Sequence, residues 1–277
     1  MNQAMNQVIE AKARANDGCQ IFYRIHPQPG KPRLVLIHSL ALDTSIWDAV
    51  VAELGFEILV YDCRGHGRSD RSPGPYSTRL FADDLAAILD HARWPAACVA
   101  GCSMGGCITQ AFAAAYPQRA QALGLIDTTA WYGPTAAADW AGRAAKAAES
   151  GFPGMIGFQV TRWFSDNFRA AHPELVDATS RVFLSNDLAC YQATCAMMSE
   201  LDFRAALPSF RMPVSIIVGE EDYATPLAMS QVLHDAIPGS ILHVIRGGRH
   251  ITPVQCPKEI AGHLRDLIAR TAAAARS

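Results

Sequence analysis

The chain has 277 residues, of which 50% are hydrophobic and 18% are charged, with a formal net charge of −2 at pH 7. These values are typical of a protein with a large packed core, and they argue against nucleic acid or an anionic membrane as a partner. Segment 1–7 is polar and lacks the apolar stretch of a secretory signal, and no apolar run approaches the roughly 18 residues of a membrane-spanning helix. We therefore expect a cytoplasmic protein.

Cysteine and histidine spacing bears on redox state and metal binding. The eight cysteines form no Cys-x-x-Cys pair, and most lie in apolar segments, which favours buried free thiols over disulfide bonds. The sequence lacks the His-x-x-His, His-Glu-x-x-His and paired-cysteine spacings of metal sites, and it lacks a phosphate-binding Gly-Lys-Ser/Thr. We expect no metal site and no phosphate-binding loop.

Apolar runs and helical spacings alternate along residues 1–127 and again after residue 206. Segments 8–14 and 19–26 flank the turn sequence Asn16-Asp17-Gly18, which predicts an antiparallel hairpin at a sheet edge. Further strands are predicted at 33–38, 57–62, 97–100, 122–127, 213–219 and 240–245, and helices at 45–54, 80–92, 107–116, 227–236 and 257–275. This order predicts an α/β fold with a mainly parallel eight-stranded sheet and helices on both faces.

Residues 128–206 interrupt this alternation. They are rich in aromatic side chains on helical-looking segments and show no strand pattern. We interpret them as a helical cap over the carboxyl edge of the sheet, inserted between two parts of the core, residues 1–127 and 207–277. Most of the aromatic side chains are expected to pack the small core of the cap itself.

The segment Gly101-Cys102-Ser103-Met104-Gly105-Gly106 lies between a predicted strand and a predicted helix. A serine with glycine two positions to either side, in this context, is typical of a nucleophile elbow. The tight turn demands small neighbours and places the hydroxyl above the sheet, near the positive end of the helix dipole. Cys102 is a less suitable nucleophile because the elbow presents residue 103. The short motif also occurs by chance, so its interpretation depends on the rest of the chain.

A serine nucleophile needs a base, and the base needs an orienting acid. On such a sheet the acid and then the histidine follow the serine in chain order. Asp222 lies after the strand at 213–219, and His250 lies after the strand at 240–245. The sequence therefore predicts a catalytic triad of Ser103, Asp222 and His250.

Three other positions remain open for the acid, namely Asp127 after the strand that follows the elbow, and Glu220 and Glu221 beside Asp222. Five further histidines lie in a glycine-rich loop or on predicted helices and strands, where structural or solvated roles are favoured. They are His66, His91, His234, His243 and His263.

The oxyanion hole is expected to use two backbone N–H groups. One belongs to Met104, directly after the nucleophile. The other is expected from the loop His38-Ser39-Leu40-Ala41-Leu42, which follows the strand at 33–38, and we predict that Leu40 supplies it.

With these motifs in place, the chain resembles the α/β-hydrolase family over nearly its whole length, and residues 62–69 are similar to the family signature D-x-R-G-x-G-x-S. Within the family it looks most like the 3-oxoadipate enol-lactone hydrolases. The stretches that carry this resemblance are Trp140-x-x-Arg143-x-x-Lys146-Ala147, Arg162-Trp163-Phe164, Asp202-Phe203-Arg204 and Gly219-x-x-Asp222-x-Ala224-Thr225-Pro226. The resemblance implies cofactor-free hydrolysis of an enol-lactone in aromatic catabolism, through attack of Ser103 and an acyl-enzyme.

The chain departs from the lactonase pattern near the predicted site. His38 replaces an asparagine, Ala41 a glycine and Cys102 a leucine, and residues 247–250 are unlike the usual last loop. These departures bear on the substrate more than on the reaction class. Alternatives are a carboxylesterase or C–C bond hydrolase for another small acid, or a non-hydrolytic member of the fold such as a haloperoxidase, a lyase or a receptor.

A substrate carboxylate in a mostly dry pocket needs a cationic partner, and the planar fork of arginine suits it. Arg143 and Arg162 of the predicted cap are candidates, with Trp140 and Trp163 as apolar walls. The alternative for each arginine is a solvated helix face. We expect a small molecule as the binding partner, and the sequence leaves a homo-oligomer open.

Overall fold

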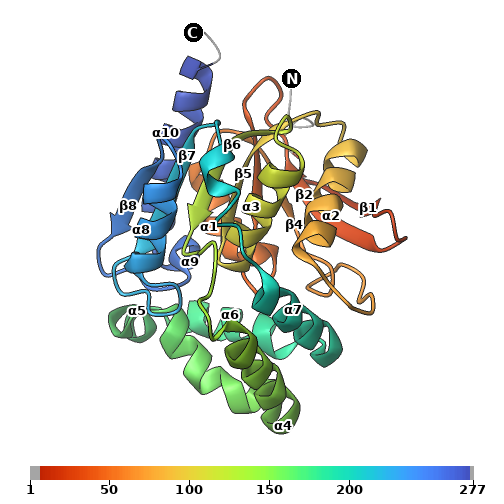
Figure 1. Ribbon diagram of the computed structural model, residues 1–277, viewed down its shortest axis with the longest axis vertical. Helices are drawn as coiled ribbons and strands as arrows, with labels where there is room; N and C mark the ends of the chain where they lie inside the picture. The colour runs from red at the N-terminus through yellow and green to blue at the C-terminus, as the bar shows by residue number, and fades with distance from the viewer. Residues whose placement is uncertain (1–6, 275–277) are drawn as a thin grey trace.

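The computed structural model describes residues 7–274, in which eight strands form one sheet in the order β1-β2-β4-β3-β5-β6-β7-β8 (Figure 1). The strands are β1 (Ile9–Arg14), β2 (Gln20–His26), β3 (Arg33–Ile37), β4 (Glu57–Tyr61), β5 (Ala97–Cys102), β6 (Ala120–Ile126), β7 (Val214–Gly219) and β8 (Ile241–Ile245). β1 and β2 pair antiparallel, β2 pairs antiparallel with β4, and every pair from β4 to β8 is parallel. The predicted mainly parallel eight-stranded sheet is confirmed.

Helices cover both faces of the sheet. They are η1 (Thr44–Trp47), α1 (Asp48–Glu53), α2 (Thr78–His91), α3 (Met104–Ala115), α4 (Ala136–Trp163), α5 (Asp166–Ala171), α6 (Pro173–Leu184), α7 (Leu188–Glu200), η2 (Leu207–Ser209), α8 (Leu227–Ala236), α9 (Thr252–Gln255) and α10 (Pro257–Ala274). α1 packs against α10, and α2 packs against α3. Because helices lie on both sides, β5 and β7 are buried along their whole length, which explains their continuous apolar sequences.

Some helix boundaries differ from the predicted ones. The predicted helix at 45–54 begins as a 3₁₀ turn, in which the Asp43 side chain accepts a hydrogen bond from the backbone N–H of Ser45. The predicted helix at 107–116 begins three residues earlier, at Met104, directly after Ser103. The short helix α9 was not predicted, since its four residues include Pro253 and show no helical repeat.

The parallel register gathers the functional loops at one edge of the sheet. Gly101 of β5 is level with Ile37 of β3, and Cys102 is level with Ile126 of β6. Further along, Gly219 of β7 is level with Ile245 of β8. The segments that leave these strands therefore emerge side by side at the carboxyl edge, where parallel sheets form binding sites.

Helices α4 to α7 lie between β6 and β7 in the chain and sit together beyond this edge (Figure 1). α4 packs along α7 and also contacts α6. An isolated antiparallel bridge between Trp131 and Asp202 joins the outgoing and returning chain at the base of this helical segment. α4 is bent at Gly151, whose φ of +62° belongs to the left-handed region, so its two halves point in different directions.

The eight cysteines are free thiols, and all but Cys256 are buried. In the part of the chain that the structure describes, no helix is both long and apolar enough to cross a membrane. Within the same residues, no cluster of three or more His, Cys, Asp or Glu side chains is arranged to hold a metal ion.

The signature loop at residues 62–69 stabilises the fold through a buried ion pair. Arg64 is 1% exposed, and its guanidinium donates to both carboxylate oxygens of Asp84 on α2, at 2.6 and 2.5 Å. It also donates to Asp17 in the turn between β1 and β2, at 2.7 Å. This arginine therefore links the hairpin, the signature loop and α2.

We expect Asp84→Ala to lower the free energy of unfolding by about 3–5 kcal/mol, because the substitution leaves a buried guanidinium without its main partner. Asp90→Ala on the same helix breaks the pair between the exposed Asp90 and the partly buried Arg119 and should cost less than about 1 kcal/mol. Urea unfolding monitored by circular dichroism measures both. Equal losses of unfolding free energy in the two variants would mean that the buried pair of Arg64 and Asp84 stabilises the fold no more than a surface pair does.

Candidate active site

Ser103 lies in a sharp turn between β5 and α3. Its φ of +55° and ψ of −115° lie outside the regions that non-glycine residues usually occupy. A Cβ atom on Gly101 would collide with the backbone of Gly105, and one on Gly105 would collide with the carbonyl oxygens of Ile37 and His38. The turn therefore requires glycine at both positions. The absence of side chains there allows α3 to begin at Met104, immediately after Ser103.

The structure brings the three predicted triad residues into one hydrogen-bonded chain. His250 Nε2 lies 3.0 Å from Ser103 Oγ, and His250 Nδ1 lies 2.8 Å from Asp222 Oδ2. In this geometry, Nδ1–H donates to the carboxylate, and Nε2 is free to accept the serine proton. The arrangement has the parts of a nucleophile, a general base and an orienting acid.

The environment of Asp222 favours its ionised form. Burial opposes ionisation, but the charge and hydrogen bond of His250 and the hydrogen bonds from Thr225 outweigh it and hold the pKa of Asp222 below its ordinary value. Asp222 Oδ1 accepts from the backbone N–H groups of Ala224 and Thr225, and Oδ2 accepts from the Thr225 hydroxyl at 2.8 Å. These bonds also fix the direction in which the carboxylate faces His250.

The alternative acids have other partners. Asp127 accepts hydrogen bonds from the N–H of Gly219 at 3.0 Å and from the N–H and hydroxyl of Thr252, at 3.1 and 2.6 Å. Burial and then the nearby Asp222 raise the pKa of Asp127 well above its usual range. Glu220 accepts from the N–H of Gly247, and Glu221 pairs with Arg249. The carboxylate bonded to His250 is thus that of Asp222.

Cys102 and the other histidines lie apart from this hydrogen-bonded chain. Burial raises the pKa of the Cys102 thiol well above its ordinary value, and Sγ lies 3.7 Å from the backbone oxygen of His250. The five histidines considered above have other contacts: His66 with the Arg64 carbonyl, His91 with Tyr23, His234 with Ser240, and His243 stacked on His263.

The loop after β3 is held by His38, a residue that departs from the lactonase pattern. His38 Nδ1 lies 2.8 Å from the carbonyl oxygen of Ser39, and the backbone N–H of Cys63 donates to Nε2. The imidazole is therefore neutral, with its proton on Nδ1. Within residues 7–274, the backbone N–H groups of Leu40 and Met104 donate to no protein acceptor, as the predicted oxyanion hole requires.

A pocket beneath the bent helix α4 leads to Ser103. Its inner compartment is small, about 20 Å³, and is lined by Ser39, Leu40, Ser103, Trp163, Thr225 and His250. A wider outer chamber of about 410 Å³ adjoins it. Five side chains line both spaces and form the neck between them, namely Tyr132, Trp140, Arg143, Gln159 and Arg162.

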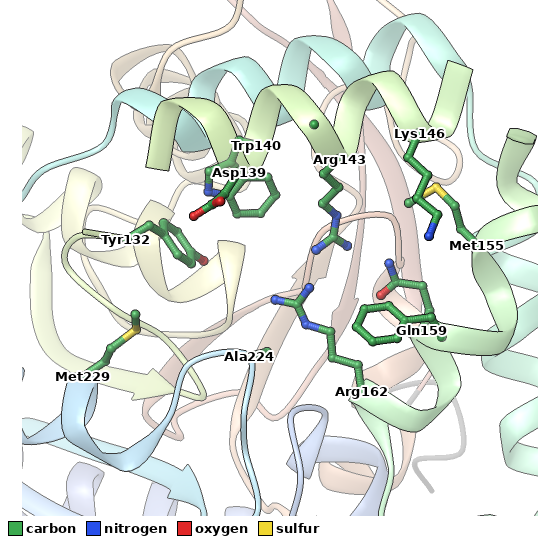
Figure 2. Close-up of a pocket in the computed structure, with 12 residues that line it drawn as sticks. Tyr132, Asp139, Trp140, Arg143, Lys146, Met155, Gln159, Arg162, Ala224 and Met229 are labelled. Atoms are coloured by element: carbon green, nitrogen blue, oxygen red, sulfur yellow. The ribbon is translucent and has the colours of Figure 1, made fainter. Parts of the chain in front are cut away.

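The two candidate arginines approach the neck from the two halves of α4. Figure 2 shows their guanidinium groups facing each other across the pocket. Arg143 Nε donates to the Tyr191 hydroxyl at 2.7 Å, and its guanidinium lies over the Trp140 ring. Among the described residues, no carboxylate pairs with either arginine. Burial and then the charge of Arg143 lower the pKa of Arg162 to about 10, so Arg162 remains cationic at neutral pH.

The structure thus brings all four cap candidates to the pocket, with Trp140, Arg143 and Arg162 at the neck and Trp163 in the inner compartment. Sequence reasoning missed Tyr132 and Gln159. For Gln159 a signal existed, because it precedes Arg162 and Trp163 by three and four residues, the spacing of one helix face. Tyr132 lies outside any regular element and had no such signal.

The family model described as the alpha/beta hydrolase fold matches residues 32–255 of this sequence. The chain belongs to the α/β-hydrolase family. It is 32% identical over 238 residues to 3-oxoadipate enol-lactonase 2 of Acinetobacter baylyi, a match spanning 85% of this chain and 88% of that protein.

Two solved structures are also similar. The enol-lactonase from Burkholderia xenovorans LB400 matches with a TM-score of 0.89 at 29% identity, over 94% of this chain and 100% of that one. A thermophilic esterase from Thermogutta terrifontis, solved with malate bound, matches with a TM-score of 0.87 at 26% identity, over 95% of this chain and 99% of that one. The resemblance to the enol-lactone hydrolases is confirmed. The chain is a hydrolase of the α/β-hydrolase family.

We expect Gly105→Ala to lower the free energy of unfolding by about 1–3 kcal/mol, because the new methyl group meets the β3 backbone and must shift the elbow. Reaction of Ser103 with a serine-directed phosphonate should slow as well. Gly157→Ala lies inside α4, where a Cβ meets nothing within 4 Å, and serves as the control. It should leave the phosphonate rate unchanged and raise the free energy of unfolding by up to about 1 kcal/mol through the higher helix propensity of alanine. A phosphonate rate unchanged in Gly105→Ala would contradict the steric argument.

Proposed function

We propose that this hydrolase cleaves a small lactone or ester that carries a carboxylate, with 3-oxoadipate enol-lactone as the leading substrate, through an acyl-enzyme on Ser103. The observation that carries the proposal is the position of two guanidinium groups, without a carboxylate partner among the described residues, at the neck of the pocket that ends at Ser103 and His250. The enol-lactonases among its relatives support the choice of a lactone.

The first half of the reaction forms the acyl-enzyme. Ser103 Oγ attacks the lactone carbonyl carbon while His250 Nε2, 3.0 Å away, takes the hydroxyl proton. Negative charge then develops on the carbonyl oxygen, and the N–H groups of Leu40 and Met104 stabilise it. When the intermediate collapses, the bond between the acyl carbon and the ring oxygen breaks, and His250 returns the proton to that oxygen. Asp222 stabilises the transient imidazolium.

The second half releases the product. The ring-opened acyl chain, still esterified to Ser103, carries an enol that tautomerises to a ketone. His250 takes a proton from water as the water attacks the ester, and it then protonates Ser103 Oγ as the acid leaves. Overall, one water is added and a 3-oxo dicarboxylic acid is produced, with no cofactor in the balance.

The arginines provide a place for the substrate carboxylate. A planar guanidinium binds a carboxylate by parallel N–H···O bonds, and such bonds are stronger where water is excluded. The guanidinium of Arg143 is held by its hydrogen bond to the Tyr191 hydroxyl. The guanidinium of Arg162 donates to no acceptor among the described residues. We therefore assign Arg162 as the main partner of the carboxylate and Arg143 as the second.

A carboxylesterase for another small acid is the second candidate. The similar esterase that holds malate favours it, because malate is itself a small carboxylic acid. This candidate uses the same triad and the same arginines, and it differs only in the group that leaves.

The test compares hydrolysis of 3-oxoadipate enol-lactone and of neutral 4-nitrophenyl acetate by the wild type and two triad variants. We expect Ser103→Ala to abolish both activities and Asp222→Asn to lower kcat by about four orders of magnitude, because the imidazole then adopts the wrong tautomer. Glu221→Gln removes the carboxylate that pairs with Arg249 and should cost less than about tenfold. Ester turnover without lactone turnover would favour the second candidate, and turnover retained by Ser103→Ala would exclude the acyl-enzyme.

Arg162→Met should raise KM for the anionic lactone about ten- to a hundredfold, the range of a lost charge-assisted hydrogen bond. KM for the neutral ester should change less than twofold. Arg169→Met, which removes the same charge from an exposed pair with Asp166 on α5, is the matched control and should leave both values unchanged. Equal effects of Arg162→Met on the two substrates would assign Arg162 a structural role.

A further inference from the structure

Gln159 is a buried polar side chain whose amide makes no side-chain hydrogen bond to the residues that the structure describes. It is 2% exposed, and its Oε1 is enclosed by protein without any hydrogen-bond donor. Within residues 7–274, its Nε2 also donates to no protein acceptor. Leaving a buried polar group unsatisfied costs about 1–3 kcal/mol, so the enclosed Oε1 indicates that the described residues are not arranged to hold this amide. Its Nε2, which is not enclosed in the same way, is left to donate to a ligand in the pocket.

The position of Gln159 indicates where that partner lies. Gln159 lines both the inner compartment that contains Ser103 and His250 and the outer chamber next to the arginines. It lies three residues before Arg162 on the same half of α4, and Figure 2 shows its amide group beside the facing guanidinium groups. A ligand that extends from Ser103 to the arginines therefore passes this amide.

The neighbouring groups define which ligand atom Gln159 can take. A guanidinium only donates hydrogen bonds, so a carboxylate at the neck is taken by Arg143 and Arg162. The amide has a neutral N–H₂ group, which suits an uncharged or partly charged oxygen. In 3-oxoadipate enol-lactone, the carbon bonded to the ring oxygen also carries the CH₂–carboxylate arm. That ring oxygen accordingly lies between the scissile carbonyl carbon and the carboxylate.

We propose that Gln159 determines the substrate class by donating a hydrogen bond from Nε2 to the leaving-group oxygen of a lactone whose carboxylate is bound by the arginines. This inference rests on the proposed function. When the bond between the acyl carbon and the ring oxygen breaks, the oxygen gains negative charge and the hydrogen bond strengthens. His250 still delivers the proton to this oxygen, and Gln159 retains both of its own, so the interaction stabilises the transition state more than the bound substrate.

Favoured substrates therefore carry the leaving oxygen one or two carbon atoms from a carboxylate. An ester whose carboxylate lies on the acyl side does not place its leaving oxygen beside Gln159. A neutral ester with a good leaving group needs little help at that oxygen and gains little from the amide.

The experiment uses Gln159→Met, which keeps the length of the side chain and removes both polar atoms. We expect kcat for 3-oxoadipate enol-lactone to fall about tenfold with KM changed less than threefold, as for one hydrogen bond made mainly in the transition state. Turnover of 4-nitrophenyl acetate should remain within twofold of the wild type, which also reports an intact fold. Gln231→Met replaces an exposed glutamine on α8 that donates to Asp235 and should match the wild type on both substrates.

Each other outcome overturns a stated part of the proposal. An unchanged lactone rate, or equal losses on both substrates, would remove Gln159 from substrate recognition while Ser103-dependent lactone turnover left the proposed function intact. A rise in KM with unchanged kcat would place the hydrogen bond on the bound substrate and overturn its assignment to the leaving oxygen. Absence of lactone turnover in the wild type would overturn both inferences. Gln159→Leu carries the same expectations if the methionine variant does not fold.

Discussion

The close approach of α3 to β3 and β5 is the constraint on which the site depends. The first turn of α3 lies so near these strands that a side chain at Gly101 or Gly105 would overlap with backbone atoms. This contact holds Ser103 in a conformation that few residues adopt and leaves the N–H of Met104 at the free N-terminus of a helix. The positions of the proposed nucleophile and of one proposed oxyanion donor therefore result from a single packing contact.

The loops that carry the acid and the base are held by a second buried carboxyl group. Asp127, at the end of β6, accepts hydrogen bonds from Gly219 at the end of β7 and from Thr252, two residues after His250. The N–H groups and the hydroxyl that it binds belong to the segments leading to Asp222 and following His250. Asp127 thus acts on the geometry of the site through the backbone, whereas Asp222 contacts the histidine.

The helical segment between β6 and β7 supplies most of the side chains at the neck of the pocket. The bend of α4 at Gly151 turns one continuous stretch of chain into two helices that face the same pocket. Arg143 comes from the first half, and Gln159 and Arg162 come from the second. Arg143 and Arg162 have no carboxylate partners among the described residues, and in the proposed function this leaves both guanidinium groups available to a substrate anion.

Much of the fold could be predicted from short stretches of sequence. Buried parallel strands require continuous apolar runs, and the elbow requires glycine at fixed positions, so the sheet and the position of Ser103 follow from local rules. The start of α3 at Met104 and the short helix α9 could not be predicted, because the residues involved are too few to show a helical repeat.

The sequence by itself determined the order of the strands, the order of the longer helices outside residues 128–206, the elbow, and the loops in which an acid and a histidine follow the last two strands. Only the tertiary structure decided which of four carboxylates contacts His250, because that depends on the register of β6, β7 and β8 and on the partners that occupy Asp127 and Glu221. It also decided that Gln159 belongs to the pocket. The position of Gln159 depends on the bend of α4 and on packing between segments that are distant in the chain. A local sequence pattern predicts neither.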